Sequence, residues 1–354
     1  MSITRTVRLA GAAILAFPLW SGAASNIDLT DYQREDGAIT LKRNVDFVDP
    51  YFSTKALLLA SRHGLNVDDS TQKWVNWLLP RQLPDGRFMR YSKASSVSEW
   101  SAGQDADADD AMMAMWVALL AQTTQGDMSE QIVNSIDRAL TQLESLRVVE
   151  NEAHSLTSAK GNDNGIGPGI YKISATNPAG LLMDNVEIYE AYVTLSRYFT
   201  AHGPAWRGKA YAARALAVAE AIEKVFWDPA LQRYRITTQA RQADDFYPDR
   251  VAQLFPLLGG LPDVRHDHRS TYKAWLRMNK QRWLMLTADY YPWGLVAIAA
   301  KRMGDSHSAQ CWAANAEPLR TGSRWNVLEE VEYAIVTSNT DHTRTDAMIE
   351  RPLC

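Results

Sequence analysis

Apolar residues recur at spacings of three and four from Pro50 onward, which is the pattern of helices that bury one face. Glycine, proline or aspartate separates these segments from one another. Apolar and polar residues alternate, as in strands, only in short pieces at 88–91 and 233–237. The pattern predicts small β-hairpins in loops and about eleven helices, at 51–63, 70–79, from the acidic segment 105–110 to 122, 129–146, 183–199, 206–226, 248–258, 269–282, 291–303, 306–316 and 326–336.

Consecutive helices are expected to pair as antiparallel hairpins, because short punctuated segments join them. Repeated hairpins bury their apolar faces only by stacking on neighbours, in an open solenoid or in a closed ring. The absence of a fixed sequence period and the long loops, above all 148–180, favour the ring. The predicted fold is an all-α (α/α)6 toroid with inner and outer helices, and no linker divides residues 25–354, which we expect to form one domain.

The N-terminus has the three parts of a secretory signal. Arg5 and Arg8 precede an apolar run at 9–20, and small residues at 21–25 follow it. The run is too short to span a bilayer as a helix. We therefore expect residues 1–24 to be removed, after Ala24, from a periplasmic or secreted bacterial protein that has no stable membrane insertion afterwards.

Composition narrows the classes of partner. The net charge of −4 and the lack of a basic stripe argue against nucleic acid. Two cysteines, Cys311 and Cys354, exclude a disulfide scaffold and a cysteine metal site, although export permits one bridge between them. No motif for a metal or another cofactor is found, so none is predicted. The 12 Trp and 14 Tyr residues can fill a core or offer flat faces to carbohydrate.

Four carboxylates lie within six residues just before the apolar segment 112–120, at Asp105, Asp107, Asp109 and Asp110. Carboxylates favour a helix N-terminus, so capping explains one or two of them. Four like charges cost stability unless a site uses them. If the helix begins by Asp107, then Asp107 and Asp110 share one face, while Asp105 and Asp109 are better explained as capping or solvated residues.

A second acidic row, formed by Asp184, Glu187 and Glu190, begins another predicted helix. A solvated stripe explains such a row equally well. Its position after the glycine-rich stretch 161–169 favours a place at the end of the barrel where the loops gather. Trp100, Tyr290, Tyr291 and Trp293 lie before or at helix starts and are candidates for stacking on sugar rings; core packing is the alternative for each.

Five segments carry a resemblance to the six-hairpin, (α/α)6-barrel glycosidase superfamily, nearest to glycoside hydrolase family 8: residues 77–88, 105–120, 184–190, 226–229 and 290–295. In that superfamily a similar aspartate motif at the start of an inner helix often supplies the catalytic base, which implies Asp107 or Asp110 here. The early Glu-Gly segment that would supply the general acid of family 8 is not found. Glycoside hydrolysis needs a second carboxyl group, and we assign Glu187 as the candidate acid and Asp184 as a substrate-binding residue.

The sequence thus predicts an exported glycoside hydrolase that acts on a polysaccharide or oligosaccharide through a carboxyl pair. Two alternatives remain open. One is a non-catalytic glycan-binding or exopolysaccharide-assembly protein on a degenerate barrel. The other is a polysaccharide lyase or epimerase, which would call for Tyr, His and Arg at the site.

Overall fold

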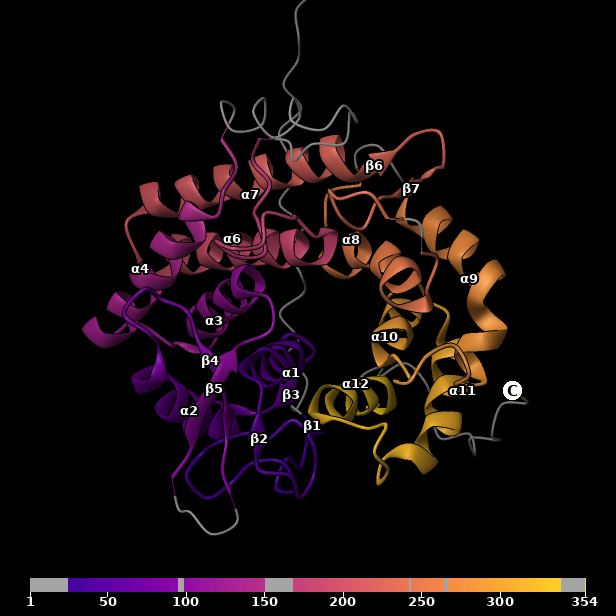
Figure 1. Cartoon of the computed structure of the whole chain (residues 1–354), viewed down its shortest axis with the longest axis horizontal. Coiled ribbons are helices and arrows are strands. Elements are labelled where there is room, and N and C mark those ends of the chain that lie inside the picture. Colours follow the sequence, from indigo (N-terminus) through magenta and orange to yellow (C-terminus); the bar gives the residue numbers. More distant parts are fainter. Residues whose placement is uncertain (1–24, 95–98, 150–167, 242, 264–266, 339–353) are drawn as a thin grey trace, which may run out of the picture.

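The computed structural model describes residues 25–94, 99–149, 168–241, 243–263, 267–338 and 354, and these residues form a ring of helices (Figure 1). The predicted (α/α)6 toroid is confirmed. The inner ring consists of α1 (Pro50–Arg62), α3 (Asp109–Thr123), α6 (Leu182–His202), a segment that ends in α8 (Phe255–Leu258), α10 (Gly294–Arg302) and α12 (Val327–Thr337). The outer layer consists of α2 (Asp68–Leu78), α4 (Glu130–Ser145), α7 (Ala205–Phe226), α9 (His268–Leu284) and α11 (Ser306–Ala316).

Burial explains which helices are inner. Helix α3 is buried on every side from Asp109 to Ala121, as expected of a helix that is apolar all round. The outer helix α4 buries only one stripe, formed by Ser135, Ile136, Ala139 and Leu143. Neighbouring inner helices contact one another in chain order, and α12 packs against α1, so that the ring closes. The segment before α1 joins this closure, because the backbone N–H of Val327 donates to the carbonyl of Leu41 at 3.0 Å.

The fourth inner element differs from the predicted continuous helix over 248–258. It consists of a π-helical turn (Phe246–Arg250), a 3₁₀ turn (Val251–Leu254) and the short helix α8. Pro248 and Pro256 lack the backbone N–H that a continuous helix needs, and Tyr247 is extended, with φ −116° and ψ 132°. This wall of the barrel is therefore irregular next to the candidate site.

The predicted β-hairpins lie in loops. Strand β4 (Met89–Ser92) pairs with β5 (Ser101–Asp105) and also with β2 (Phe47–Val48), which makes a three-stranded antiparallel sheet. Strands β6 (Trp227–Asp228) and β7 (Arg233–Tyr234) form the second hairpin, and β1 (Ser25–Asn26) pairs with β3 (Leu65–Asn66). Short 3₁₀ turns occur at Leu79–Arg81 and Glu317–Leu319. Strand β5 leads directly into α3 and so carries the acidic segment to the end of the barrel.

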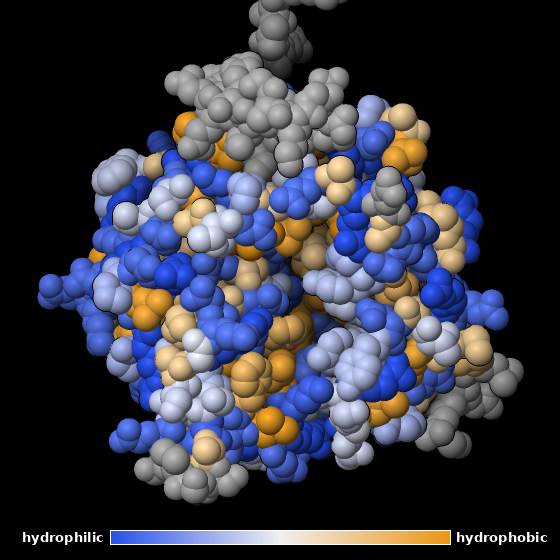
Figure 2. Space-filling model, in the orientation of Figure 1, coloured by the Kyte–Doolittle hydropathy of each residue, from blue (hydrophilic) through white to orange (hydrophobic). Residues whose placement is uncertain are grey.

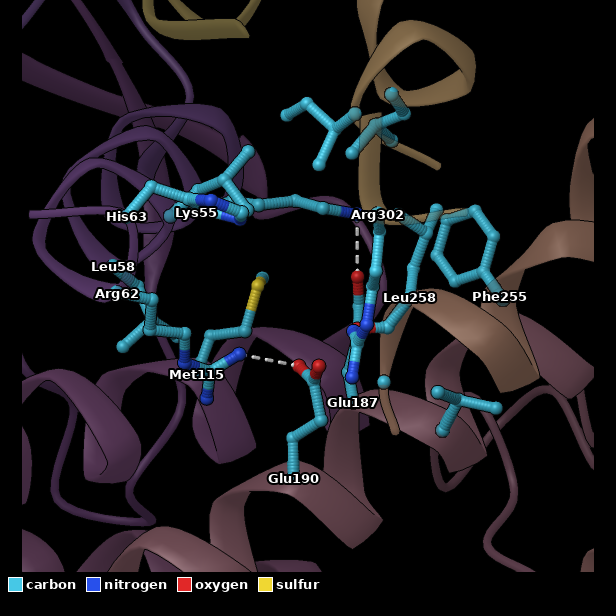
Figure 3. Close-up of a pocket in the computed structure, with 15 residues that line it drawn as sticks. Lys55, Leu58, Arg62, His63, Met115, Glu187, Glu190, Phe255, Leu258 and Arg302 are labelled. Carbon is cyan, nitrogen blue, oxygen red and sulfur yellow. Dashed lines mark hydrogen bonds and ion pairs between the residues drawn. The ribbon is translucent and has the colours of Figure 1, made fainter. Parts of the chain in front are cut away.

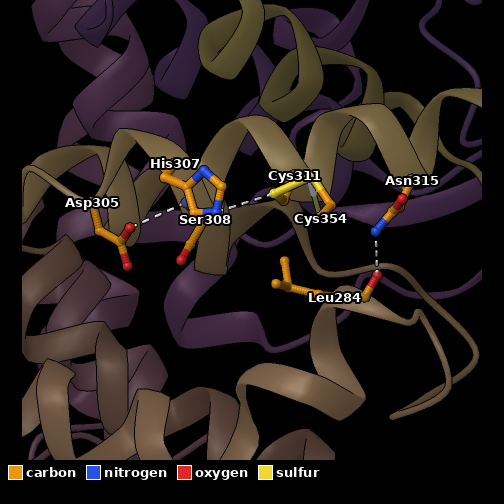
Figure 4. Close-up of a disulfide and its surroundings, with 7 residues drawn as sticks. All are labelled: Leu284, Asp305, His307, Ser308, Cys311, Asn315 and Cys354. Atoms are coloured by element: carbon orange, nitrogen blue, oxygen red, sulfur yellow. Dashed lines mark hydrogen bonds between the residues drawn. A yellow bond between two sulfur atoms is a disulfide. The ribbon is translucent and has the colours of Figure 1, made fainter. Parts of the chain in front are cut away.

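Cys311 and Cys354 form a disulfide that ties the last residue of the chain to α11 (Figure 4). The pairing that the sequence left open is thus present. Within the described ranges, no helix has both the length and the apolar character needed to cross a bilayer.

Candidate functional site

The N-terminal ends of the inner helices gather at one end of the barrel, because each outer helix returns the chain to that end. Helix dipoles make this end favourable for carboxylates. The face shown in Figure 2 is hollowed near its centre, and both polar and apolar residues border the hollow. Acidic side chains from α3, α6 and α12 lie at the starts of these helices.

Helix α3 begins at Asp109, whereas a shared face for Asp107 and Asp110 requires a helix that has begun by Asp107. Ala108 is the N-cap and has a left-handed backbone, with φ 48°, and no side chain caps the helix. This conformation is uncommon for a residue other than glycine and costs roughly 1–3 kcal/mol. The expectation that Asp107 and Asp110 share a helical face is therefore wrong, because Asp107 lies before the helix.

The four aspartates have four different environments. Asp105 is exposed and lies 3.2 Å from Arg87, whereas Asp109 is buried and lies 3.7 Å from the same guanidinium. The expectation that Asp109 is capping or solvated is therefore wrong; burial raises the pKa of its carboxyl to about 6. Asp107 is exposed and lies 3.5 Å from Arg90. Asp110 is fully buried, so it is the member of the segment that faces the interior.

Asp110 and Asp184 form a buried carboxyl pair between α3 and α6. Both Asp110 oxygens and Asp184 Oδ2 lack a partner at hydrogen-bonding geometry in the described part of the chain. Burial raises the pKa of each group well above its usual value. The charge of Asp184 adds to the rise at Asp110, and the charges of Glu187 and Asp107 add to the rise at Asp184. Two adjacent buried carboxyl groups of this kind favour one shared proton over two negative charges.

Glu187 lies one turn further along α6 and is ion-paired. Lys55 Nζ donates to Glu187 Oε1 at 2.5 Å, and the Tyr51 hydroxyl donates to the same oxygen at 3.1 Å. Burial raises the pKa of Glu187, while Lys55 and Tyr51 oppose that rise. Glu187 therefore lies in the same carboxyl cluster as Asp110 and Asp184 but has donors that they lack.

A second buried carboxyl pair, Glu329 and Glu332, lies at the start of α12. Glu329 accepts the backbone N–H groups of Trp293 and Gly294 at 2.9 and 3.0 Å, and burial raises its pKa to about 7 despite these donors. Glu332 Oε1 lacks a hydrogen-bond partner among the described residues, and burial, followed by the charge of Glu329, raises the pKa of Glu332 well above its usual value. The charge of Lys55 opposes this rise in the pKa of Glu332.

Sequence reasoning missed this second pair. The available signal was the acid-rich start of the predicted helix 326–336, where Glu329 and Glu332 have the same i, i+3 spacing as Asp184 and Glu187. Trp293, the N-cap of α10, has a left-handed backbone with φ 59°, as Ala108 has before α3. Each buried carboxyl pair thus has one strained backbone position beside it, and such strain is typical of a functional site.

Two aromatic rings lie beside the carboxyl groups. Tyr247 stacks on Trp293, with ring centroids 4.3 Å apart, and Trp293 Nε1 donates to Asp289 at 2.8 Å. Burial raises the pKa of the Tyr247 hydroxyl, and the charges of Asp184, Asp107 and Glu187 raise it further, so the hydroxyl lies near those carboxylates. Trp293 was a predicted sugar-binding residue, whereas Tyr247 was not.

The other predicted aromatic residues do not belong to this stack. Tyr290 and Tyr291 pack edge to face, and Lys42 Nζ lies 5.6 and 6.0 Å from their ring centroids. Trp100 packs against Trp77 of the outer helix α2, and its Nε1 donates to Asp36 at 2.7 Å. The structure thus does not bring Trp100 to the carboxyl cluster.

A cavity of about 50 Å³ lies behind the cluster, within the barrel (Figure 3). The Lys55–Glu187 pair lines it together with a second pair, in which Arg62 Nη1 lies 2.6 Å from Glu190 Oε2. Met115, Phe255 and other apolar side chains form the rest of its wall. Its volume is enough for a few water molecules but not for a sugar ring. In the part of the chain that the structure describes, no group of three or more His, Cys, Asp or Glu side chains is arranged to hold a metal.

Comparison with known proteins agrees with the class of fold. No family model matches the sequence, and no curated protein is similar to it in sequence. The structure, however, resembles those of helical-toroid glycosidases.

An α-amylase from Clostridium perfringens has a TM-score of 0.52 and 11% identity, over 87% of this chain and 93% of that one. A glycosidase variant in complex with glucose has a TM-score of 0.55 and 11% identity, over 87% and 92% of the two chains. A wild-type glycosidase has a TM-score of 0.54 and 12% identity over the same shares. These similarities establish the toroid fold.

Proposed function

We propose that the protein is an exported glycoside hydrolase that acts on a polysaccharide or oligosaccharide through carboxyl groups on two walls of the barrel. The observation that carries the proposal is the pair of buried carboxyl clusters, Asp110–Asp184 and Glu329–Glu332, at one end of a toroid shared with glycosidases. In the order of the ring, α6 and α12 are opposite each other (Figure 1). Hydrolysis of a glycoside needs a proton donor and a second carboxylate on opposite sides of the scissile bond.

The two clusters suit different roles. The Asp110–Asp184 pair retains a proton and is the candidate general acid. The Glu329–Glu332 pair, in which burial raises the pKa of Glu329 to about 7, is the candidate carboxylate that activates water. This assignment differs from the roles predicted from the sequence. The proposed general acid is Asp184 in place of Glu187, and the proposed base lies on α12 in place of Asp107 or Asp110.

The test is hydrolysis of a panel of polysaccharides and oligosaccharides, with the products separated by chromatography. Asp184→Asn and Glu332→Gln should abolish product release while circular dichroism and thermal unfolding show a folded protein. The remaining carboxyl groups are ranked by the activity that is left in four further variants: Asp107→Asn, Asp110→Asn, Glu187→Gln and Glu329→Gln. Asp105→Asn, which changes an exposed carboxyl group, is the matched control. Full activity in both principal variants would refute the assignment.

One observation favours a second candidate, a non-catalytic glycan-binding protein. The side chains of Asp110, Asp184 and Glu332 are exposed to only 0, 4 and 1%. A degenerate barrel with closed carboxyl groups would bind oligosaccharide saturably without releasing product. The lyase alternative remains a possible outcome of the same assay, because absorbance of unsaturated sugars would reveal that activity.

Export is proposed from residues 1–24, which lie outside the described residues. The Cys311–Cys354 disulfide supports it, because such bonds persist in oxidising compartments. Expression in a bacterium, fractionation of the cells and the mass of the mature protein test it. A cytoplasmic chain that keeps Met1 would contradict it.

A further inference from the structure

Lys55 lies one helical turn after Tyr51 on α1, and the two side chains converge on Glu187. Lys55 Nζ donates to Glu187 Oε1 at 2.5 Å and to the Tyr51 hydroxyl at 3.0 Å, and that hydroxyl donates to Glu187 Oε1 at 3.1 Å. The three groups form a closed triangle of hydrogen bonds. A buried carboxyl group with a cationic donor and a hydroxyl donor is favoured in its ionised form.

The triangle borders both carboxyl clusters. Asp184 lies one turn before Glu187 on α6, and the charge of Lys55 by itself lowers the pKa of both Asp184 and Glu332, although burial outweighs it at each. Several titratable or charged groups face the triangle from the elements around it. They are Arg62 and His63 on or beside α1, Asp107 and Asp110 at the start of α3, Asp184 and Glu190 on α6, Tyr247 before α8, Arg302 on α10 and Glu332 on α12.

We propose that Lys55 is a positioning residue that holds Glu187 as a carboxylate, so that the proton of this carboxyl cluster lies on the Asp110–Asp184 pair and not on Glu187. Burial is the main cause that favours a proton on this pair, and an ionised Glu187 one turn away adds to it by disfavouring a negative charge on Asp184. The inference rests on the proposed function, because it explains how that pair stays ready to protonate a leaving group. The distribution of protons among these carboxyl groups can be measured in the free protein, without a substrate.

Infrared difference spectra of the mature protein, recorded over a pH titration, detect protonated carboxyl groups through their C=O stretching bands. At neutral pH the double variant Asp110→Asn/Asp184→Asn should lose a band, whereas Glu187→Gln should lose none. Lys55→Met should gain one band, and Lys55→Met/Glu187→Gln should lack that additional band. Lys55→Arg, which retains the cation, should keep the wild-type bands.

Arg62→Met is the matched control, because it removes the other cation that pairs with an α6 carboxylate in the same cavity. It should leave the Asp110–Asp184 band at its wild-type position. In hydrolysis assays, Lys55→Met should lower kcat at least tenfold, leave KM within about twofold and move the pH optimum, whereas Arg62→Met should keep the optimum.

Loss of a neutral-pH band in Glu187→Gln would overturn the inference, because Glu187 would then carry the proton beside Lys55. The wild-type and Glu187→Gln spectra decide this even if Lys55→Met does not fold. If no glycan is hydrolysed, the proposed function fails, while the spectra still decide where the protons lie. The two failures are thus distinguishable.

Discussion

The ring of Tyr247 stacks on that of Trp293, with centroids 4.3 Å apart, although the two residues belong to different walls of the barrel. The stack lies beside the carboxyl groups, since the charges of Asp184 and Glu187 act on the Tyr247 hydroxyl. It joins the irregular segment before α8 to the start of α10. Its position makes it the best candidate among the aromatic residues for holding a sugar against the carboxyl groups.

Removing either ring of this stack should weaken glycan binding. Aromatic contacts of this kind contribute about 0.5–1.5 kcal/mol beyond buried area, so Tyr247→Ala and Trp293→Ala should each raise the Kd for a bound oligosaccharide by roughly 3–10-fold. Isothermal titration calorimetry measures the change. Trp206→Ala, at an exposed ring on the outer helix α7, should leave the Kd unaltered. Equal losses in all three variants would contradict a specific stack.

Asp184→Asn should lower kcat by about 10²–10⁴-fold with KM nearly unchanged, because proton donation acts in the transition state. Steady-state kinetics on the best glycan substrate measure the ratio. The matched control is Glu190→Gln on the same helix, since Glu190 pairs with Arg62 toward the rear cavity. A control with the same loss of kcat would show that any change on this helix disables the site.

Asp109 should make the protein less stable as the pH rises. Its folded-state pKa of about 6 lies above the usual value of 3.8, so the folded form binds the proton more tightly than the unfolded form. Its contribution to stability is present below pH 3.8 and is lost as the pH rises through about 6. Allowing for solvent screening, Asp109→Asn should recover about 1 kcal/mol at pH 7.

Urea unfolding of wild type and Asp109→Asn at pH 4 and at pH 7 tests this linkage. The difference between the two proteins should be larger at pH 7. Asp105→Asn is the control, because Asp105 pairs with the same Arg87 but is exposed. The predicted sign would be wrong if Asp109→Asn lowered the free energy of unfolding more at pH 7 than at pH 4.

Gly294→Ala should disrupt the start of α10. A Cβ atom there would lie 2.6 Å from Glu332 Cβ and 2.8 Å from the ring of Trp312. Overpacking of this kind costs about 1–3 kcal/mol and would displace Glu332. Thermal unfolding and kcat should both fall. In Gly103→Ala the nearest atom would be 3.8 Å away, so that variant should behave as wild type.

The toroid could be predicted because amphipathic periodicity marks each helix and short connections force neighbours to pair. The broken element before α8 could not, because the apolar spacing of 248–258 continues through Pro248 and Pro256. The start of α3 was misplaced because Ala108 adopts a left-handed backbone that alanine rarely takes. No local pattern shows that conformation.

Part of the candidate carboxyl cluster could be predicted as a group of neighbouring acidic residues, while its role in function stays a prediction. Asp110, Asp184 and Glu187 belong to acid-rich helix starts that the sequence displays, and they lie together in the structure. The proposed role of Glu332 depends on the closure of the ring, which brings α12 beside α1 and Lys55 within reach of its charge. Contacts between residues nearly 280 positions apart leave no trace in local periodicity.

Closure of the ring between α1 and α12 also fixes the order in which the site can be completed. A ribosome makes α1 early and α12 near the end, so the two cannot meet while most of the chain is being synthesised. Non-local contacts of this kind form late, since they require the ends of a long loop to meet. The facing carboxyl clusters therefore come together only when nearly the whole chain is available, and shorter nascent chains lack the second wall.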